Sequence, residues 1–230
     1  MNPDPALVSD PIVVLLAWAG GAALAGAIVT ALGLVGAGFT WLAAGTTVLV
    51  GIWPALAGDM WAAGGVAAAA VGGALTTIDR RLAGALLATG GALLLGATAV
   101  MAGWPLAATA TLALGGITGE MLLGHWYLVD PTLSRKVLRG LAIAGLVGMA
   151  SDVAIVGLVL GFPDDGFLAI VLAALAVTTM GLMAAVIGAL RYPAYSGVMA
   201  ATGLSYLAVL TGLAAVFFGR VFPTGGVTAF

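Results

Sequence analysis

Charged side chains and cysteine are what this chain has least of. Its 230 residues include no cysteine, one histidine, 7 basic and 9 acidic side chains, so 7% of the chain is charged. A water-soluble domain has about 25% charged residues. With 63% hydrophobic residues, most of the surface must face lipid. We therefore expect an all-α, polytopic integral membrane protein whose first partner is the lipid bilayer.

The missing residues exclude several kinds of chemistry. Without cysteine the chain has no disulfide, no iron–sulfur cluster and no c-type haem attachment. One histidine excludes a bis-histidine haem and a multi-histidine metal site within this chain. No basic residue precedes Arg80, so no cleavable signal peptide is predicted. A net charge of −2 gives no reason to expect a nucleic-acid partner.

Long apolar runs fill most of the chain. A membrane span needs about 20 predominantly apolar residues, and short segments rich in glycine, proline and aspartate separate the runs. The turn between the first two runs is expected at residues 36–38, where only glycine and alanine mark it. Over a single transmembrane domain, 1–230, the sequence predicts a bundle of about eight spans, at 12–35, 39–57, 61–78, 82–102, 106–129, 137–160, 167–190 and 195–218.

The basic residues predict the orientation of these spans. With eight spans, three loops that share one side hold, or closely precede, six of the seven basic residues: Arg80, Arg81, Arg135, Lys136, Arg139 and Arg191. The positive-inside rule places these loops in the cytoplasm and both termini outside. The expected location is the cell membrane, plasma or inner.

Two stretches of the chain resemble each other. Residues 15–29 and 86–100 are both rich in alanine, glycine and leucine, and a glycine–aromatic pair follows each. A three-helix repeat would place the two copies in inverted orientation, as in many transporters. The alternative is that two spans of the same composition are alike by chance.

Two carboxylates fall inside predicted spans. Glu120 is about ten residues from the cytoplasmic end of its span and Asp152 about fifteen, so we expect depths of about 15 and 22 Å. A short loop joins the two spans, which favours antiparallel neighbours with the carboxyls close in depth. Two such carboxyls form a candidate intramembrane proton or cation site. Alternatively, each is a protonated hydrogen bond between helices, with a partner among Thr109, Thr111, Thr118, Ser151, Thr178, Thr179, Ser205 and Tyr206.

Spacing along the fifth span suggests which way Glu120 faces. Gly116, Glu120 and Gly124 recur every four residues, which places them on one face of a helix. Because small residues let helices approach closely, this face is expected to contact protein.

The only histidine, His125, begins a short polar–aromatic group. It lies five residues after Glu120, about 140° away around the helix, so the two do not form a metal motif. Trp126 and Tyr127 follow it, which is typical of the membrane interface. The sharper interpretation makes His125 a peripheral titrating group, or makes His125, Trp126 and Tyr127 a quinone contact.

Two functional hypotheses follow. The first is translocation of protons, cations or a small solute through Glu120 and Asp152. The second is a non-transporting membrane subunit or assembly factor of a larger respiratory or quinone-linked complex, for which homo-oligomers or other membrane subunits are the expected partners. An enzyme is not favoured, since no nucleophile lies beside a base in the sequence. A quinone is the one cofactor left open, and no metal site is predicted.

Overall fold

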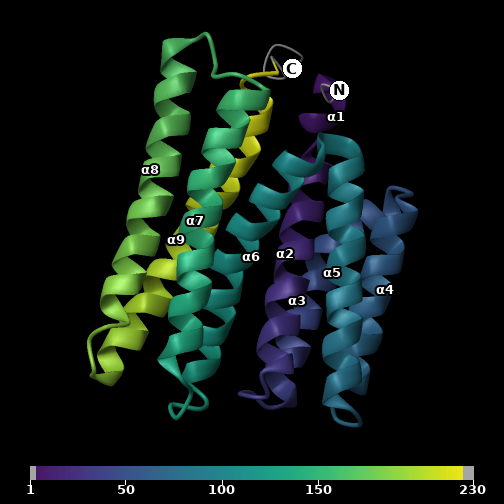
Figure 1. Ribbon diagram of the computed structural model, residues 1–230, viewed down its shortest axis with the longest axis vertical. Helices are drawn as coiled ribbons and strands as arrows, with labels where there is room; N and C mark the ends of the chain where they lie inside the picture. Colours follow the sequence, from purple (N-terminus) through teal and green to yellow (C-terminus); the bar gives the residue numbers. More distant parts are fainter. Residues whose placement is uncertain (1–3, 225–230) are drawn as a thin grey trace.

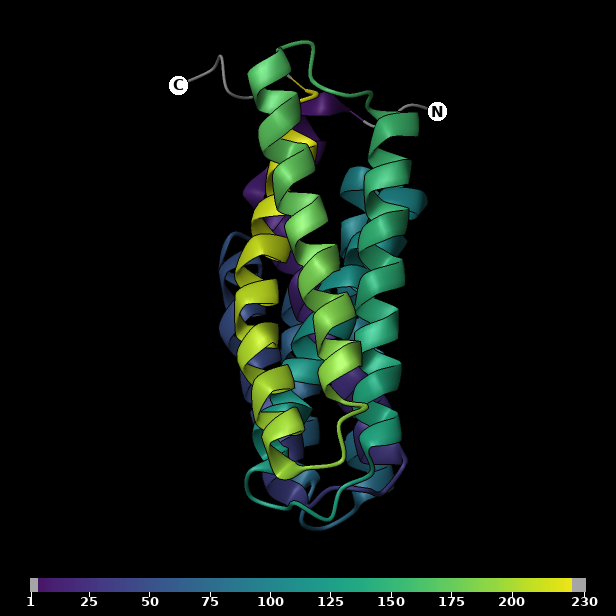
Figure 2. The same cartoon turned by 90° about the vertical axis from the view of Figure 1, so that its left-hand side faces the viewer.

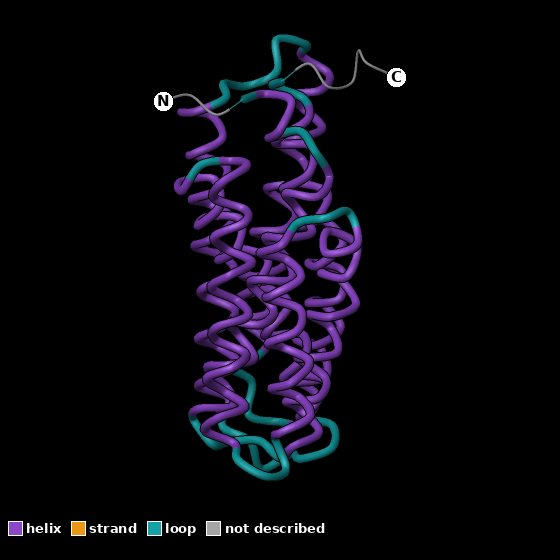
Figure 3. Tube along the Cα trace, turned by 90° about the vertical axis from the view of Figure 1, so that its right-hand side faces the viewer, coloured by secondary structure: helices purple, strands orange, loops and turns teal. Residues whose placement is uncertain are grey.

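The computed structural model describes residues 4–224, which form helices joined by short loops (Figures 1 and 3). The helices are α1 (Pro5–Val8), α2 (Pro11–Ala31), α3 (Ala37–Leu56), α4 (Met60–Leu75), α5 (Arg80–Ala102), α6 (Trp104–Tyr127), α7 (Arg135–Val159), α8 (Gly166–Ala189) and α9 (Tyr195–Val221). Seven of them are long and apolar enough to cross a membrane, and α4 is a shorter apolar helix of 16 residues. The all-α, multi-pass architecture is therefore confirmed, and the count of eight spans is approximately right.

Helices α2 to α9 form two groups of four. Helices α2 to α5 pack against one another, as do α6 to α9, and α2 and α6 make the main contact between the groups. Figure 1 shows α6 running obliquely between them, and Figure 2 shows α8 and α9 side by side, with α7 next to α8. The group α6 to α9 contains both carboxylates that the sequence places inside spans.

Glycines set the turns at two helix ends. Gly103, with φ of +83°, is both the C-cap residue of α5 and the N-cap residue of α6. Only a residue without a Cβ adopts this backbone readily. The first loop differs from the expected one, because α2 ends at Ala31 and Gly33 turns the chain with φ of +68°. The Arg80 guanidinium donates to the Gly33 carbonyl at 3.4 Å, which ties this turn to the start of α5.

Small residues let α2, α6 and α7 touch backbone to backbone. A Cβ added to Gly21 would lie 2.6 Å from Gly115 Cα, and one added to Gly116 would lie 2.2 Å from Gly145 N. Real side chains do not fit into such spaces, so glycine is required for these crossings. The two similar segments, 15–29 and 86–100, lie on α2 and α5, which also pack against each other. The inverted repeat stays a prediction, with chance similarity of the two segments as its alternative.

Candidate functional site

Most carboxylates outside the spans have structural partners. Those of five aspartates accept hydrogen bonds from the first backbone N–H groups of α1, α2, α4, α5 and α8: Asp4, Asp10, Asp59, Asp79 and Asp165. Such N-caps satisfy donors that have no partner within the helix. The capping aspartates therefore need no functional explanation.

Asp130 is likewise held by its own loop. Its carboxylate accepts hydrogen bonds from the Thr132 hydroxyl at 2.6 Å and from the Thr132 N–H at 3.1 Å. These bonds favour the ionised form and lower the pKa of Asp130. Only Glu120 and Asp152 remain as acidic side chains inside the apolar helices.

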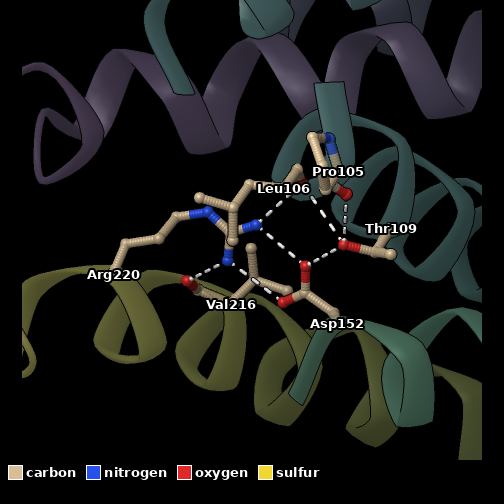
Figure 4. A network of polar contacts seen from close by, with 6 residues as sticks. All are labelled: Pro105, Leu106, Thr109, Asp152, Val216 and Arg220. Carbon is tan, nitrogen blue, oxygen red and sulfur yellow. Dashed lines mark hydrogen bonds and ion pairs between the residues drawn. The ribbon is translucent and has the colours of Figure 1, made fainter. Parts of the chain in front are cut away.

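Asp152 of α7 forms an ion pair with Arg220 of α9 (Figure 4). Arg220 Nη2 lies 2.8 Å from Asp152 Oδ1, and Arg220 Nη1 lies 3.0 Å from Asp152 Oδ2. The Thr109 hydroxyl of α6 donates to Asp152 Oδ1 at 2.7 Å. Asp152 and Arg220 are 2% and 1% exposed. Two parallel contacts between a guanidinium and a carboxylate are the strongest geometry available to such a pair.

Arg220 also binds two backbone carbonyls. It donates to Leu106 O of α6 at 3.0 Å and to Val216 O of its own helix at 2.9 Å, and its Nε has no hydrogen-bond partner. The cluster thus joins α6, α7 and α9 near the end of the bundle that holds α1 (Figures 1 and 4). A cavity of about 10 Å³ borders Asp152, which is on the order of the space needed by one water molecule. Asp152 is therefore paired with the opposite charge of Arg220 and is enclosed by protein.

Glu120 has a different environment. It is fully buried, its Oε2 lies at the Ser205 hydroxyl of α9, and its Oε1 has no hydrogen-bond partner. The one ion pair among residues 4–224 is that of Asp152 and Arg220, so no cation balances Glu120. An intramembrane carboxyl without a counter-ion is costly to keep charged.

The Ser205 hydroxyl has one proton and two neighbouring acceptors. It also lies 2.9 Å from the Ala201 carbonyl, one turn earlier in α9. If Ser205 donates to Ala201, a protonated Glu120 can donate to Ser205, and every proton then has an acceptor. This arrangement of donors is consistent with a proton on Glu120, and Oε1 remains without a donor.

The structure separates the two carboxyls that the sequence was expected to bring together. Asp152 contacts Thr109 on α6, eleven residues before Glu120, which corresponds to about 16 Å along the helix axis. The prediction that the two carboxyls lie at a similar depth is therefore wrong. Helix α7 extends beyond the level of Glu120 and places Asp152 beside the N-terminal part of α6. The hydrogen-bond partners Thr109 and Ser205, named among the candidates from sequence, are confirmed.

Apolar packing lies between the two polar sites. Gly212 stands about midway between Ser205 and Arg220 on α9. A Cβ placed on it would lie 3.1 Å from Ile117 Cδ1 and 3.6 Å from Met149 Cε. Ile117 and Met149 are fully buried. The third neighbour of this position is the Thr179 methyl group at 3.4 Å, so the atoms packed around Gly212 between the two sites are apolar.

The polar–aromatic group 125–127 lies toward the opposite end of α6 from Asp152. His125 is exposed, and its Nδ1 lies 3.1 Å from the Tyr206 hydroxyl of α9. Trp126 packs against Gly38 of α3, and Tyr127 is buried beside the Tyr195 ring, with centroids 6.3 Å apart. The three side chains therefore face different neighbours and do not form one site. Their functional role stays a prediction.

Arg220 is the member of the Asp152 site that sequence reasoning missed. The sequence predicts that the last apolar run ends at 218, which places Arg220 in a loop, whereas α9 continues to Val221. The sequence carries one signal for this pair: Arg220 is the one basic residue outside the three basic loops. It follows the last predicted span, at the end of the bundle opposite to those loops, and the predicted depth of Asp152 places it toward that same end. A buried acid and a lone cation toward the same end of a bundle are candidates for an ion pair.

The chain was compared with protein-family models, with curated proteins and with solved structures, and none of them matches it. The functional argument therefore depends on the geometry of the site.

Proposed function

We propose that the protein moves protons across the membrane through the α6–α9 group, with Glu120 as the residue that binds and releases them. The observation that carries this proposal is that Glu120 is fully buried and has neither a counter-ion nor a partner for Oε1. A carboxyl held in this way binds a proton readily and has room for a second hydrogen bond. Asp152 takes part as the partner of Arg220 and not as a carrier.

The contact between α6 and α9 offers a route to Glu120. Ser205, which touches Glu120, is followed in α9 by Tyr206, which touches His125. His125 lies about 7 Å from Glu120 along the α6 axis, toward the loops that hold most basic residues. Imidazole and phenol groups exchange protons through hydrogen bonds, so this pair is suited to bring protons to the buried site.

Release toward the other end requires a rearrangement. The buried side chains of Ile117 and Met149 pack beside Gly212, which lies on α9 between Ser205 and Arg220. Farther along, the Asp152–Arg220 cluster joins α6, α7 and α9. We infer that the structure corresponds to a state in which Glu120 exchanges protons only with the His125 side. Alternating access of this kind is how transporters avoid an open pore.

Proton flux into vesicles tests the proposal. The purified protein would be reconstituted in liposomes that enclose a pH-sensitive dye, and a potassium diffusion potential would drive protons inward. We expect flux above that of empty liposomes for the wild type and background flux for Glu120→Gln. Asp165→Asn, which alters only a helix cap, is the matched control and should keep wild-type flux. Equal flux in Glu120→Gln and wild type would overturn the proposal.

A second candidate is a non-transporting subunit of a larger membrane complex. The observation that favours it is the complete pairing of Asp152, beside a cavity of about 10 Å³ only. Wild-type protein without flux above empty liposomes would support this alternative.

A further inference from the structure

A groove of about 380 Å³ lies between α2 and α6. Figure 1 shows α6 crossing between the two four-helix groups. Residues of α2 and α6 line it, together with Leu95 of α5 and with Leu141 and Ala144 of α7. Its volume is within the range of small-molecule sites, which often lie at junctions between packed units.

Three of the glycines with close backbone contacts also line the groove. Gly21, Gly115 and Gly116 all line the groove, and each presses against another backbone where it lacks a Cβ. The groove therefore lies directly beside the points where α2, α6 and α7 touch backbone to backbone. Leu112 and Ile28, also in the lining, are 44% and 56% exposed, so the groove opens toward lipid.

One polar side chain interrupts this apolar lining. Thr111 is 4% exposed and its hydroxyl has no hydrogen-bond partner. Several other buried threonines donate to the carbonyl four residues earlier, as Thr98 does to Leu94 at 2.8 Å and Thr202 to Val198 at 2.9 Å. Thr76 also has no partner, but it does not line the groove. A buried hydroxyl without a partner costs roughly 1–3 kcal/mol, which an acceptor on a bound molecule would offset.

The depth of Thr111 restricts the kind of molecule. It lies seven residues inside α6, or about 10 Å from the end of the helix. At that depth a phospholipid presents only its hydrocarbon chains, because its oxygens lie in the interfacial layer. A ligand for Thr111 must bring an oxygen into the hydrocarbon region on an otherwise apolar body.

We propose that this groove binds an apolar molecule with a carbonyl oxygen, the chemistry of an isoprenoid quinone, and that the Thr111 hydroxyl donates a hydrogen bond to that oxygen. The site is separate from Glu120, since nine residues of α6 place the two on opposite faces of the helix. It also lies about 21 Å along α6 from His125, where a quinone contact was expected from sequence.

Ligand binding to the purified protein in nanodiscs tests this inference. The probe is decylubiquinone, and decylbenzene, which has the chain and a ring without the carbonyls, is the comparison. Thr111→Val removes the hydroxyl at constant shape, and Ala108→Phe fills the groove from an exposed position. Thr178→Val, at an exposed site on α8, is the matched control.

We expect saturable binding of decylubiquinone to the wild type and to Thr178→Val. Thr111→Val should bind it roughly five- to tenfold more weakly, as expected for one lost hydrogen bond, and Ala108→Phe should not bind it. Wild-type affinity in Thr111→Val, or decylbenzene binding as tightly as decylubiquinone, would overturn the inference. So would the absence of saturable binding to wild-type protein.

Discussion

Arg220 and Asp152 face each other across α9 and α7 with both guanidinium Nη atoms on the carboxylate, at 2.8 and 3.0 Å. Removing one partner leaves the other charge buried and unbalanced. Such changes cost roughly 3–5 kcal/mol, whereas replacing both partners by apolar residues is often neutral.

The first prediction follows from this pairing. Arg220→Met should lower the thermal stability of the detergent-solubilised protein strongly, and the double variant Asp152→Leu/Arg220→Met should recover most of the loss. Arg139→Met, at an exposed position of α7, is the control and should unfold like wild type. A single variant as stable as the wild type would show that the pair does not hold α7 and α9 together.

The second prediction concerns the protonation of the two intramembrane acids. Infrared spectra over a range of pH should show a protonated carboxyl band that Glu120→Gln removes and Asp152→Asn leaves in place, because Glu120 has no counter-ion whereas both carboxylate oxygens of Asp152 contact the Arg220 guanidinium. Ser205→Ala should shift this band to higher frequency, since it removes the hydrogen bond to Glu120. A band that disappears in Asp152→Asn instead would contradict the assignment.

Gly116 provides the third prediction. Alanine there would bring a Cβ to 2.2 Å from Gly145 N, which neighbouring backbones cannot easily accommodate. We expect Gly116→Ala to destabilise the protein by roughly 1–3 kcal/mol or more. Gly140→Ala, in the same pair of helices but with open space around it, should be neutral or stabilising by up to about 1 kcal/mol. Thermal unfolding of the two variants makes the comparison, and equal loss in both would argue against a tight α6–α7 crossing.

The absence of cysteine allows a clean test of orientation, the fourth prediction. Pro131→Cys and Asp164→Cys each place one thiol in a loop, at opposite ends of the bundle. A membrane-impermeant maleimide added to intact cells should label Asp164→Cys and label Pro131→Cys only after lysis. The reverse pattern would invert the orientation predicted from the basic residues.

Much of the fold could be predicted from sequence, because bilayer thickness fixes the length of each apolar run. The ends also had local signals: Asp79 and Asp165 cap helices, and Gly103 ends one. The site could be predicted only in part. Glu120 and Asp152 are recognisable as charges in apolar runs, but the distance between them depends on the axial position of α7 relative to α6. Glycine contacts such as Gly116 with Gly145 set that packing, and no spacing in the sequence gives their register.

The 16-residue length of α4 has a consequence for the surrounding lipid. Its apolar length is about 24 Å, whereas the hydrocarbon layer of a typical bilayer is about 30 Å thick. Because α4 lies at the edge of its four-helix group (Figure 1), lipids meet this mismatch directly. The membrane should thin by a few ångströms along that side. Shorter acyl chains, or a neighbouring protein with an equally short hydrophobic belt, would then gather there in preference to the rest of the molecule's perimeter.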